Sequence, residues 1–150
     1  MSALAVGDTV FWQAFKPSGM TKSGSYTATT SYAVVPTWVA DTGGFPGSTV
    51  SSNGLVVQNT VGNAVLSVQL SCNVPIGQQT QSVDVQFYRG ATLVGTTTPV
   101  SCPVNATTLV TGSVSGVAVT AGDIITVRTK KSNAFGMTVT AASWVRITVP

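Results

Sequence analysis

Short runs of alternating apolar and polar residues recur along the chain, and glycine, proline, asparagine and serine separate them about every ten residues. Alternation with period two is typical of a β-strand with one buried face, and no stretch shows the 3.6-residue period of an amphipathic helix. Strands are predicted near residues 8–12, 32–39, 54–60, 64–72, 83–88, 92–98, 107–115, 117–120, 124–130 and 138–149. The pattern therefore predicts an all-β sandwich or jelly roll.

Two pairs of these runs are predicted to form hairpins. VDVQFY and TLVGTT flank Arg89, Gly90 and Ala91, and VAVT and DIITVRT flank Ala121 and Gly122. Glycine supplies the positive φ that tight turns between antiparallel strands require.

Alternation also assigns the buried side of two strands. The side chains predicted to enter the core are Ala64, Leu66, Val68, Leu70, Val83, Val85 and Phe87. Asp84, Gln86 and Tyr88 then point outward.

The last strand, SWVRITVP, carries Trp144 and Arg146 on the side opposite to Val145 and Ile147. One side suits a core, whereas a tryptophan beside an arginine on the other side suits a protein partner. We therefore consider Tyr88, Trp144 and Arg146 as candidate interface residues. The alternative is that Tyr88 and Trp144 are ordinary half-exposed aromatic residues.

Composition favours a subunit of a larger assembly. The 150 residues fit one domain, and only 7% of them are charged although 43% are hydrophobic. A surface with so few charged residues is typical of β-rich proteins whose surface is partly covered by neighbouring subunits. No apolar run is long enough for a transmembrane helix, so no membrane insertion is expected. MSALAVGDTVFW lacks a basic leader, so no signal peptide is expected either.

The net charge of +3 does not predict a nucleic-acid partner. Seven bases are scattered along the chain, and only Lys130 and Lys131 are adjacent. Nucleic-acid binding needs clustered bases with aromatic residues between them. A weak positive field is still compatible with an acidic protein partner.

The sequence offers little for catalysis. It has no histidine, and its four acidic residues, Asp8, Asp41, Asp84 and Asp123, are far apart. Asp41 and Asp123 lie where aspartate is favoured in turns, and a single Asp-Thr-Gly triplet lacks the second half of an aspartic protease. We therefore predict no enzyme activity, no metal site and no cofactor.

Cys72 and Cys102 lie in similar contexts, LSCNVP and VSCPVN, at predicted strand ends. Two thiols without histidine are too few for a structural metal. Either they form a disulfide, which would stabilise the fold by about 3 kcal/mol in an oxidising setting, or they are two buried free thiols.

VAVTAGDIITVRT and the closing SWVRITVP resemble the last strands of tumour necrosis factor/C1q-like jelly rolls. PSGMTKSG, TSYAVVPTWVADT, FPGSTVSSNGLVVQ and SWVRIT together resemble small β-rich virion proteins of tailed phages that infect actinobacteria. The resemblance covers roughly residues 17 to 150. It implies a homotrimeric antiparallel jelly roll whose terminal strand is central in its sheet and faces the threefold axis. On this basis Tyr88, Trp144 and Arg146 are predicted to meet their copies at the trimer interface.

The segment 1–24 precedes most of this resemblance, and residues 25–150 are predicted to form the jelly-roll domain. Phe11, Trp12 and Phe15 make the segment rich in aromatic residues. It is predicted to be either a first strand that packs on its own domain or an attachment arm that anchors these side chains in a partner.

The resemblance implies a structural protein of the phage virion, assembled in the host cytoplasm. The favoured function is capsid decoration: a trimer on the capsid exterior that binds the major capsid protein and stabilises the shell. The alternative is a minor tail protein or tail-fibre head that binds tail proteins and a host-surface receptor. The small, polar loops TVGN and IGQQTQ favour decoration, because a receptor-binding module would expose aromatic residues in such loops.

Overall fold

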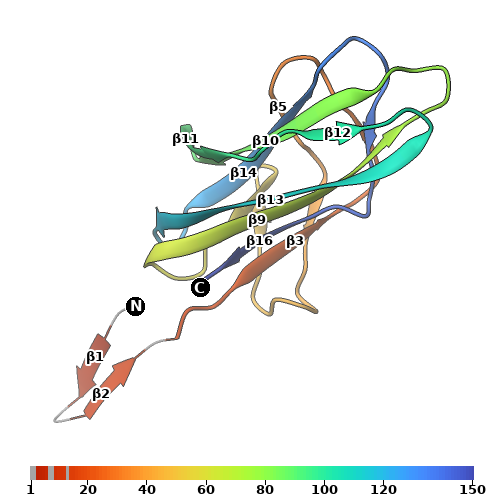
Figure 1. The fold of residues 1–150 in the computed structure, drawn as a ribbon. Coiled ribbons are helices and arrows are strands. Elements are labelled where there is room, and N and C mark those ends of the chain that lie inside the picture. Colours follow the sequence, from red (N-terminus) through yellow and green to blue (C-terminus); the bar gives the residue numbers. More distant parts are fainter. Residues whose placement is uncertain (1–2, 7–8, 13) are drawn as a thin grey trace.

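In the computed structural model the described residues are 3–6, 9–12 and 14–150, with side chains from residue 14 onward, and these residues form strands and no helix (Figure 1). Every strand pairing is antiparallel. Two layers of strands lie face to face. The described residues include no helix that is long and apolar enough to span a membrane.

One layer, the β10 sheet, has the strand order β11–β10–β14–β8–β7, with β12 also beside β10 and β5 also beside β14. Its strands are β5 (Ala33–Val34), β7 (Val50–Ser51), β8 (Gly54–Val56), β10 (Gln81–Arg89), β11 (Thr92–Thr96), β12 (Val100–Cys102) and β14 (Ile124–Lys131).

The other layer, the β9 sheet, has the order β4–β15–β9–β16–β3–β6, with β13 also beside β9. Its strands are β3 (Ser18–Lys22), β4 (Tyr26–Thr27), β6 (Trp38–Ala40), β9 (Val61–Val74), β13 (Ala106–Val119), β15 (Thr138–Val139) and β16 (Trp144–Thr148). The terminal strand β16 lies between β9 and β3, which agrees with the central position that the resemblance implies.

A third, two-stranded sheet pairs β1 (Ala3–Val6) with β2 (Thr9–Trp12). Figure 1 shows this hairpin beyond the end of the sandwich at which the C-terminus lies. Within the segment 1–24, however, Ser18–Lys22 form β3 and pair with β16, so this part of the segment is a strand of the sandwich.

The core lies between the two large sheets and is built as the alternation predicts. All seven side chains predicted to enter it are at most 1% exposed. Ile125, Val127, Val145 and Ile147 fill it from β14 and β16, and Met20 and Met137 are fully buried beside them. Burying one such aliphatic side chain stabilises the fold by about 1.5–3 kcal/mol.

The predicted hairpin at Arg89, Gly90 and Ala91 is confirmed, because β10 pairs with β11 and Gly90 has a φ of 58°. The predicted hairpin at Ala121 and Gly122 is wrong. There β13 belongs to the β9 sheet and β14 to the β10 sheet, so the turn carries the chain from one layer to the other.

Three further predictions change in detail. The predicted strand 32–39 is two strands in different sheets, and Thr37, with a φ of 60°, breaks it. The predicted strands 107–115 and 117–120 are one strand, β13, whose register shifts between Val114 and Val117. The predicted strand 138–149 is divided into β15 and β16 by a turn.

Candidate interaction surfaces

The outward side of the β9 sheet, the β9 face, presents an arginine held between two aromatic rings. The Arg146 guanidinium carbon lies 4.1 Å from the centre of the Trp144 ring and 5.4 Å from that of the Phe45 ring. Stacking on aromatic rings suits the planar, weakly hydrated guanidinium group. Its Nε is buried and has no hydrogen-bond partner. Arg146 is therefore held by its neighbours and already partly shielded from water.

Phe45 reaches this position from the loop between β6 and β7 because Gly19 makes room for it. Gly19 lies opposite Arg146 in the register of β3 and β16. A Cβ atom at Gly19 would lie 2.3 Å from the Phe45 ring. The loop itself is fixed by Asp41, whose carboxylate accepts the Gly44 N–H at 3.0 Å and whose backbone carbonyl accepts the Phe45 N–H at 2.8 Å. Asp41 therefore has the structural role in a turn that the sequence predicts.

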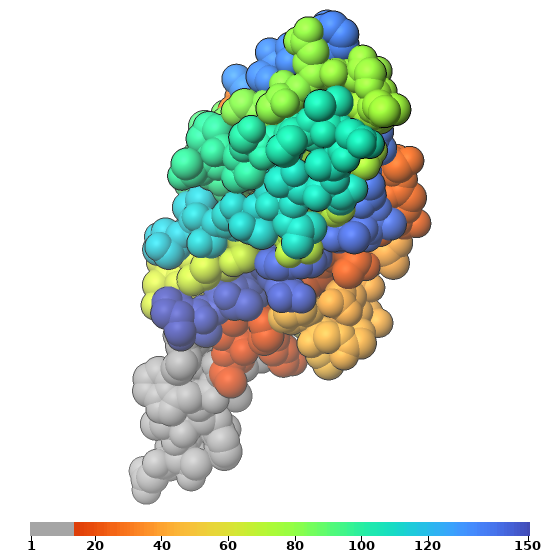
Figure 2. Space-filling model, turned by 45° about the vertical axis from the view of Figure 1, so that its right-hand side comes forward, coloured from red at the N-terminus to blue at the C-terminus, as the bar shows by residue number. Residues whose placement is uncertain are grey.

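The other side chains of the β9 face are mostly small and polar, and two exposed aliphatic side chains, Val39 and Leu109, lie among them. Strand register places Gln69 beside Trp144 and Ser67 beside Arg146. The face includes Thr21, Val39, Ser67, Gln69, Leu109, Thr111, Ser113, Trp144 and Arg146, with Phe45 at its edge. In Figure 2 the segments that form it follow one another across the surface: β13 in teal, β9 in yellow-green, β16 in blue and the residues around 45 in light orange. A face with central aromatic residues and an arginine, and little other charge, has the composition of an interface core.

Tyr88 lies on the other side of the sandwich from Trp144 and Arg146. It is half-buried on β10, and the Arg128 guanidinium carbon lies 3.9 Å from the centre of its ring. The outward side of the β10 sheet, the β10 face, also carries Tyr32, Asp84, Gln86 and Lys130. The three predicted interface residues therefore do not form one patch. Of the three, only Trp144 and Arg146 can belong to the same trimer interface, and that interface stays a prediction.

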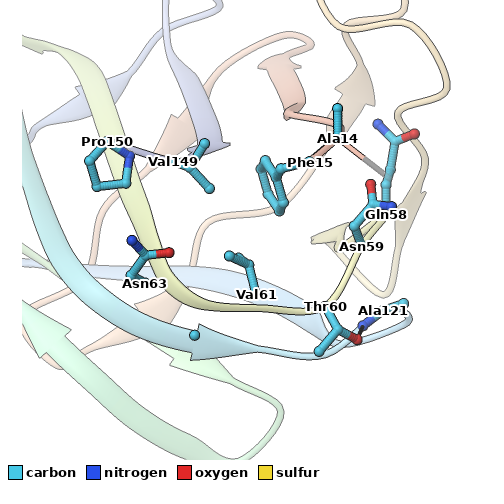
Figure 3. A pocket seen from close by; sticks show the side chains of 11 residues that line it. Ala14, Phe15, Gln58, Asn59, Thr60, Val61, Asn63, Ala121, Val149 and Pro150 are labelled. Atoms are coloured by element: carbon cyan, nitrogen blue, oxygen red, sulfur yellow. Dashed lines mark hydrogen bonds between the residues drawn. The ribbon is translucent and has the colours of Figure 1, made fainter. Parts of the chain in front are cut away.

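A hollow of about 760 Å³, the terminal hollow, opens where the chain enters the sandwich from β2 and where it ends (Figure 3). The Phe15 side chain lies at its centre, with Val149 on one side and Asn59 on the other. The other residues that line it are Ala14, Gln58, Thr60, Val61, Gly62, Asn63, Ala121 and Pro150. Its lining combines the apolar side chains of Phe15, Val61 and Val149 with the amide groups of Gln58, Asn59 and Asn63.

Phe15 differs from the other two predicted attachment residues. It is half-buried and packs against the core, and Asn59 accepts the N–H of the next residue, Lys16, at 2.8 Å. Phe15 therefore packs on its own domain, as the first-strand alternative predicts. The side chains of Phe11 and Trp12 lie outside the described residues, so their role in attachment stays a prediction.

Cys72 on β9 and Cys102 on β12 come from opposite sheets, and both are fully buried free thiols. Of the two alternatives that the sequence leaves open, the structure shows two buried free thiols and no disulfide between Cys72 and Cys102. Hydrogen bonding with Cys102, together with burial, raises the pKa of the Cys72 thiol far above its usual value. Hydrogen bonding with Cys72 lowers the pKa of Cys102. The pair is therefore a packed contact between the layers.

The described aspartates are occupied in structural roles. Asp123 accepts the Thr120 N–H at 2.8 Å in the turn between the sheets, and Asp84 accepts the Tyr32 hydroxyl proton at 2.5 Å. Among residues 14–150, no three histidine, cysteine or acidic side chains come together in a way that could hold a metal ion. That the protein has no enzyme activity remains a prediction.

Sequence reasoning missed Phe45 and the pairing of Tyr32 with Asp84 and Lys130. Phe45 is the one aromatic residue in the turn-rich segment DTGGFPG, and aromatic residues are unusual in a loop of that composition. An aromatic residue in such a loop is the sequence signal that could have identified Phe45 as a candidate surface residue. No local sequence pattern indicates that the Tyr32 hydroxyl reaches Asp84 on β10. The two residues come together because β14 pairs with both β5 and β10, which are far apart in the sequence.

No protein-family model and no curated protein matches the chain. Solved structures do match. Eiger TNF from S. frugiperda superposes with a TM-score of 0.59 at 16% sequence identity, covering 92% of this chain and 94% of that one. Murine APRIL at pH 8.5 gives a TM-score of 0.54 at 15% identity, covering 90% of this chain and all of that one. The chain therefore has a TNF-like jelly-roll fold, as the sequence predicts.

Proposed function

We propose that this protein is a structural subunit of a phage virion, a homotrimeric capsid decoration protein that binds the major capsid protein and stabilises the shell. The β9 face is the observation that carries the proposal. In a chain with only 7% charged residues, it gathers two aromatic rings, an arginine and small hydroxyl side chains on one surface. Such a surface suits contact with other copies of the same chain.

Self-association through this face needs no large electrostatic cost. Arg146 is its only charged side chain, and two aromatic rings already flank the guanidinium. Burying an isolated charge in an interface costs several kcal/mol, but a guanidinium that is already partly desolvated loses less. The TNF-like fold supports the same proposal, because the resemblance in the sequence implies a trimer with this strand at the threefold axis.

Attachment to the shell is assigned to the end that holds the β1–β2 hairpin and the terminal hollow. Phe11 and Trp12 belong to β2, and each aromatic side chain buried on a partner contributes about 2–3 kcal/mol. Ordering a segment costs about 1–2 kcal/mol per residue, so one arm binds weakly. Three arms on one trimer bind together and reach a much higher avidity.

Deleting residues 1–13 tests this assignment while keeping Phe15 in place on the core. The truncated protein is expected to stay folded and to keep the oligomeric state of the full chain, but to leave particles undecorated. Particles without the protein are expected to release their genome at lower temperature than decorated ones. Cryo-electron microscopy of decorated particles and thermal genome-release assays measure both effects.

Two outcomes contradict the proposal. If the truncated chain still occupies every shell site, the hairpin is not the attachment segment. If the full chain is found only at the tail, it is a minor tail protein or tail-fibre head, and the decoration function is wrong.

A further inference from the structure

A second, polar hollow of about 360 Å³ opens on the β10 face, away from both the β9 face and the terminal hollow. It lies where the ends of β10 and β14 meet the loop before β12. The residues that line it are Thr30, Ser82, Asp84, Pro99, Lys130, Lys131 and Ser132. Most of these side chains are polar, whereas polar and apolar side chains share the lining of the terminal hollow.

Asp84 and Lys130 are opposite each other in the register of β10 and β14, yet they do not pair. The Lys130 ammonium instead lies 4.6 Å from the centre of the Tyr32 ring, and Asp84 Oδ2 accepts the Tyr32 hydroxyl proton. Within residues 14–150, Lys130 donates no hydrogen bond and forms no ion pair. Its neighbour Lys131 is different, because its ammonium donates to the carbonyl oxygens of Ala134 and Phe135 at 3.3 and 2.6 Å.

Tyr32 holds this arrangement in place over a wide pH range. Burial first, and then the bond to Asp84, raise the pKa of Tyr32 to about 12. The phenol therefore remains a donor at neutral pH and fixes one oxygen of Asp84. The other carboxylate oxygen and the ammonium of Lys130 stay available at the hollow.

These groups match the chemistry of a sugar that carries a carboxylate. A carboxylate oxygen such as that of Asp84 accepts hydrogen bonds from ligand hydroxyls, and an unpaired ammonium binds a ligand carboxylate through charge-assisted bonds. The hydroxyls of Ser82 and Thr30 add donors and acceptors, and the ring of Pro99 offers an apolar surface. Ligand sites of this kind combine a few placed polar groups with an apolar surface.

Charge selects among the possible ligands. Two lysines and one aspartate line the hollow, so a single negative charge is favoured there. We propose that this hollow binds a uronic-acid unit of a polysaccharide, with the sugar carboxylate on Lys130 and sugar hydroxyls on Asp84.

Titration of the full-length protein with tetragalacturonate, followed by amide chemical shifts, tests the proposal. The neutral control is β-1,4-galactotetraose, which lacks the carboxylates. The acidic sugar is expected to bind with shifts centred on Asp84 and Lys130, and the neutral sugar at least tenfold more weakly. Lys130→Gln is expected to weaken acidic binding by about tenfold, as loss of a charge-assisted hydrogen bond does.

Arg128→Gln is the matched control, because it removes the same charge from the same strand and face two residues away. It is expected to change the affinity less than about twofold. The proposal is wrong if tetragalacturonate does not bind, if the neutral sugar binds equally well, or if the two variants weaken binding alike. The experiment needs no virion, so its result is independent of the decoration function.

Discussion

The two outward faces of the sandwich differ in chemistry although the same alternating pattern produces both. The β9 face has one charged side chain, Arg146, stacked between two rings, among serines and threonines. The β10 face carries Asp84, Arg128 and Lys130 together with two tyrosines. Burying the second set in a protein interface would desolvate three charges, which costs several kcal/mol for each charge left unpaired. Alternation thus decides which side chains leave the core, and the identity of those side chains decides what each face can bind.

Replacing the central aromatic residue on each face should separate their roles most strongly. Trp144→Ala is expected to weaken self-association by about 2 kcal/mol or more, because a buried aromatic anchor is lost. That loss raises the dissociation constant by roughly thirtyfold. Tyr88→Ala removes an aromatic side chain of similar exposure from the other face and is expected to leave association unchanged. Sedimentation equilibrium over a concentration series measures both constants. Equal weakening by the two variants would remove the distinction between the faces.

A smaller effect is expected from Gly19→Ala, which acts on the β9 face through Phe45. The new methyl group would overlap the Phe45 ring, so the ring must leave its place beside Arg146. Association is expected to weaken by about 1 kcal/mol, the usual size of a local packing change. Gly62→Ala is the control, because a Cβ atom there meets nothing within 4 Å and Gly62 has no positive φ. If both variants associate like the unchanged protein, Phe45 does not shape the interface.

The smallest effect concerns Tyr32 on the β10 face and appears only at alkaline pH. Its folded-state pKa, about 12, lies above the ordinary value of 10.0, so the folded chain holds this proton more tightly than the unfolded chain. The resulting stabilisation is fully present below pH 10 and is lost as the pH rises through 12. Tyr32→Phe should therefore flatten the fall in unfolding free energy between pH 10 and 12, measured by denaturant titration.

Lys22, which also titrates at alkaline pH, does not affect the comparison between the unchanged protein and Tyr32→Phe. Burial lowers its pKa from 10.5, so its own contribution to stability rises with pH, but it is the same in both proteins and cancels in the difference. Asp84→Asn adds an independent check, because loss of the carboxylate should lower the pKa of Tyr32. A phenolate absorbance titration that shows no late-ionising tyrosine would contradict the contact between Tyr32 and Asp84.

The sequence predicts best where one side of a long strand is buried. The inward residues of 64–72 and 83–88 alternate without a break, so both strands and their buried sides follow from period two alone. β3 was missed because its Ser-Gly start follows a proline and looks like a turn. Glycine at position 19 leaves space for the Phe45 ring. The two residues are far apart in the sequence, so no local pattern predicts this contact.

Pairing partners are the main feature that the sequence could not supply. The turn at Ala121 and Gly122 was correctly recognised, but turn chemistry does not say whether the next strand continues the same sheet. Here β13 pairs with β9 over almost its whole length, which leaves β14 to join β10. For the same reason, alternation predicted that Tyr88 and Trp144 point outward but not that they lie on opposite sides of the molecule.

The mass of the full-length protein in solution tests the central claim, self-association through the β9 face, most directly. Sedimentation velocity at micromolar concentration is expected to give three times the chain mass of 15.3 kDa for the unchanged protein and for Tyr88→Ala, with dissociation in Trp144→Ala. High salt should change this little, because Arg146 is the only charge on the face. A single species of 15.3 kDa at every concentration, with and without the proposed capsid-protein partner, would contradict the account.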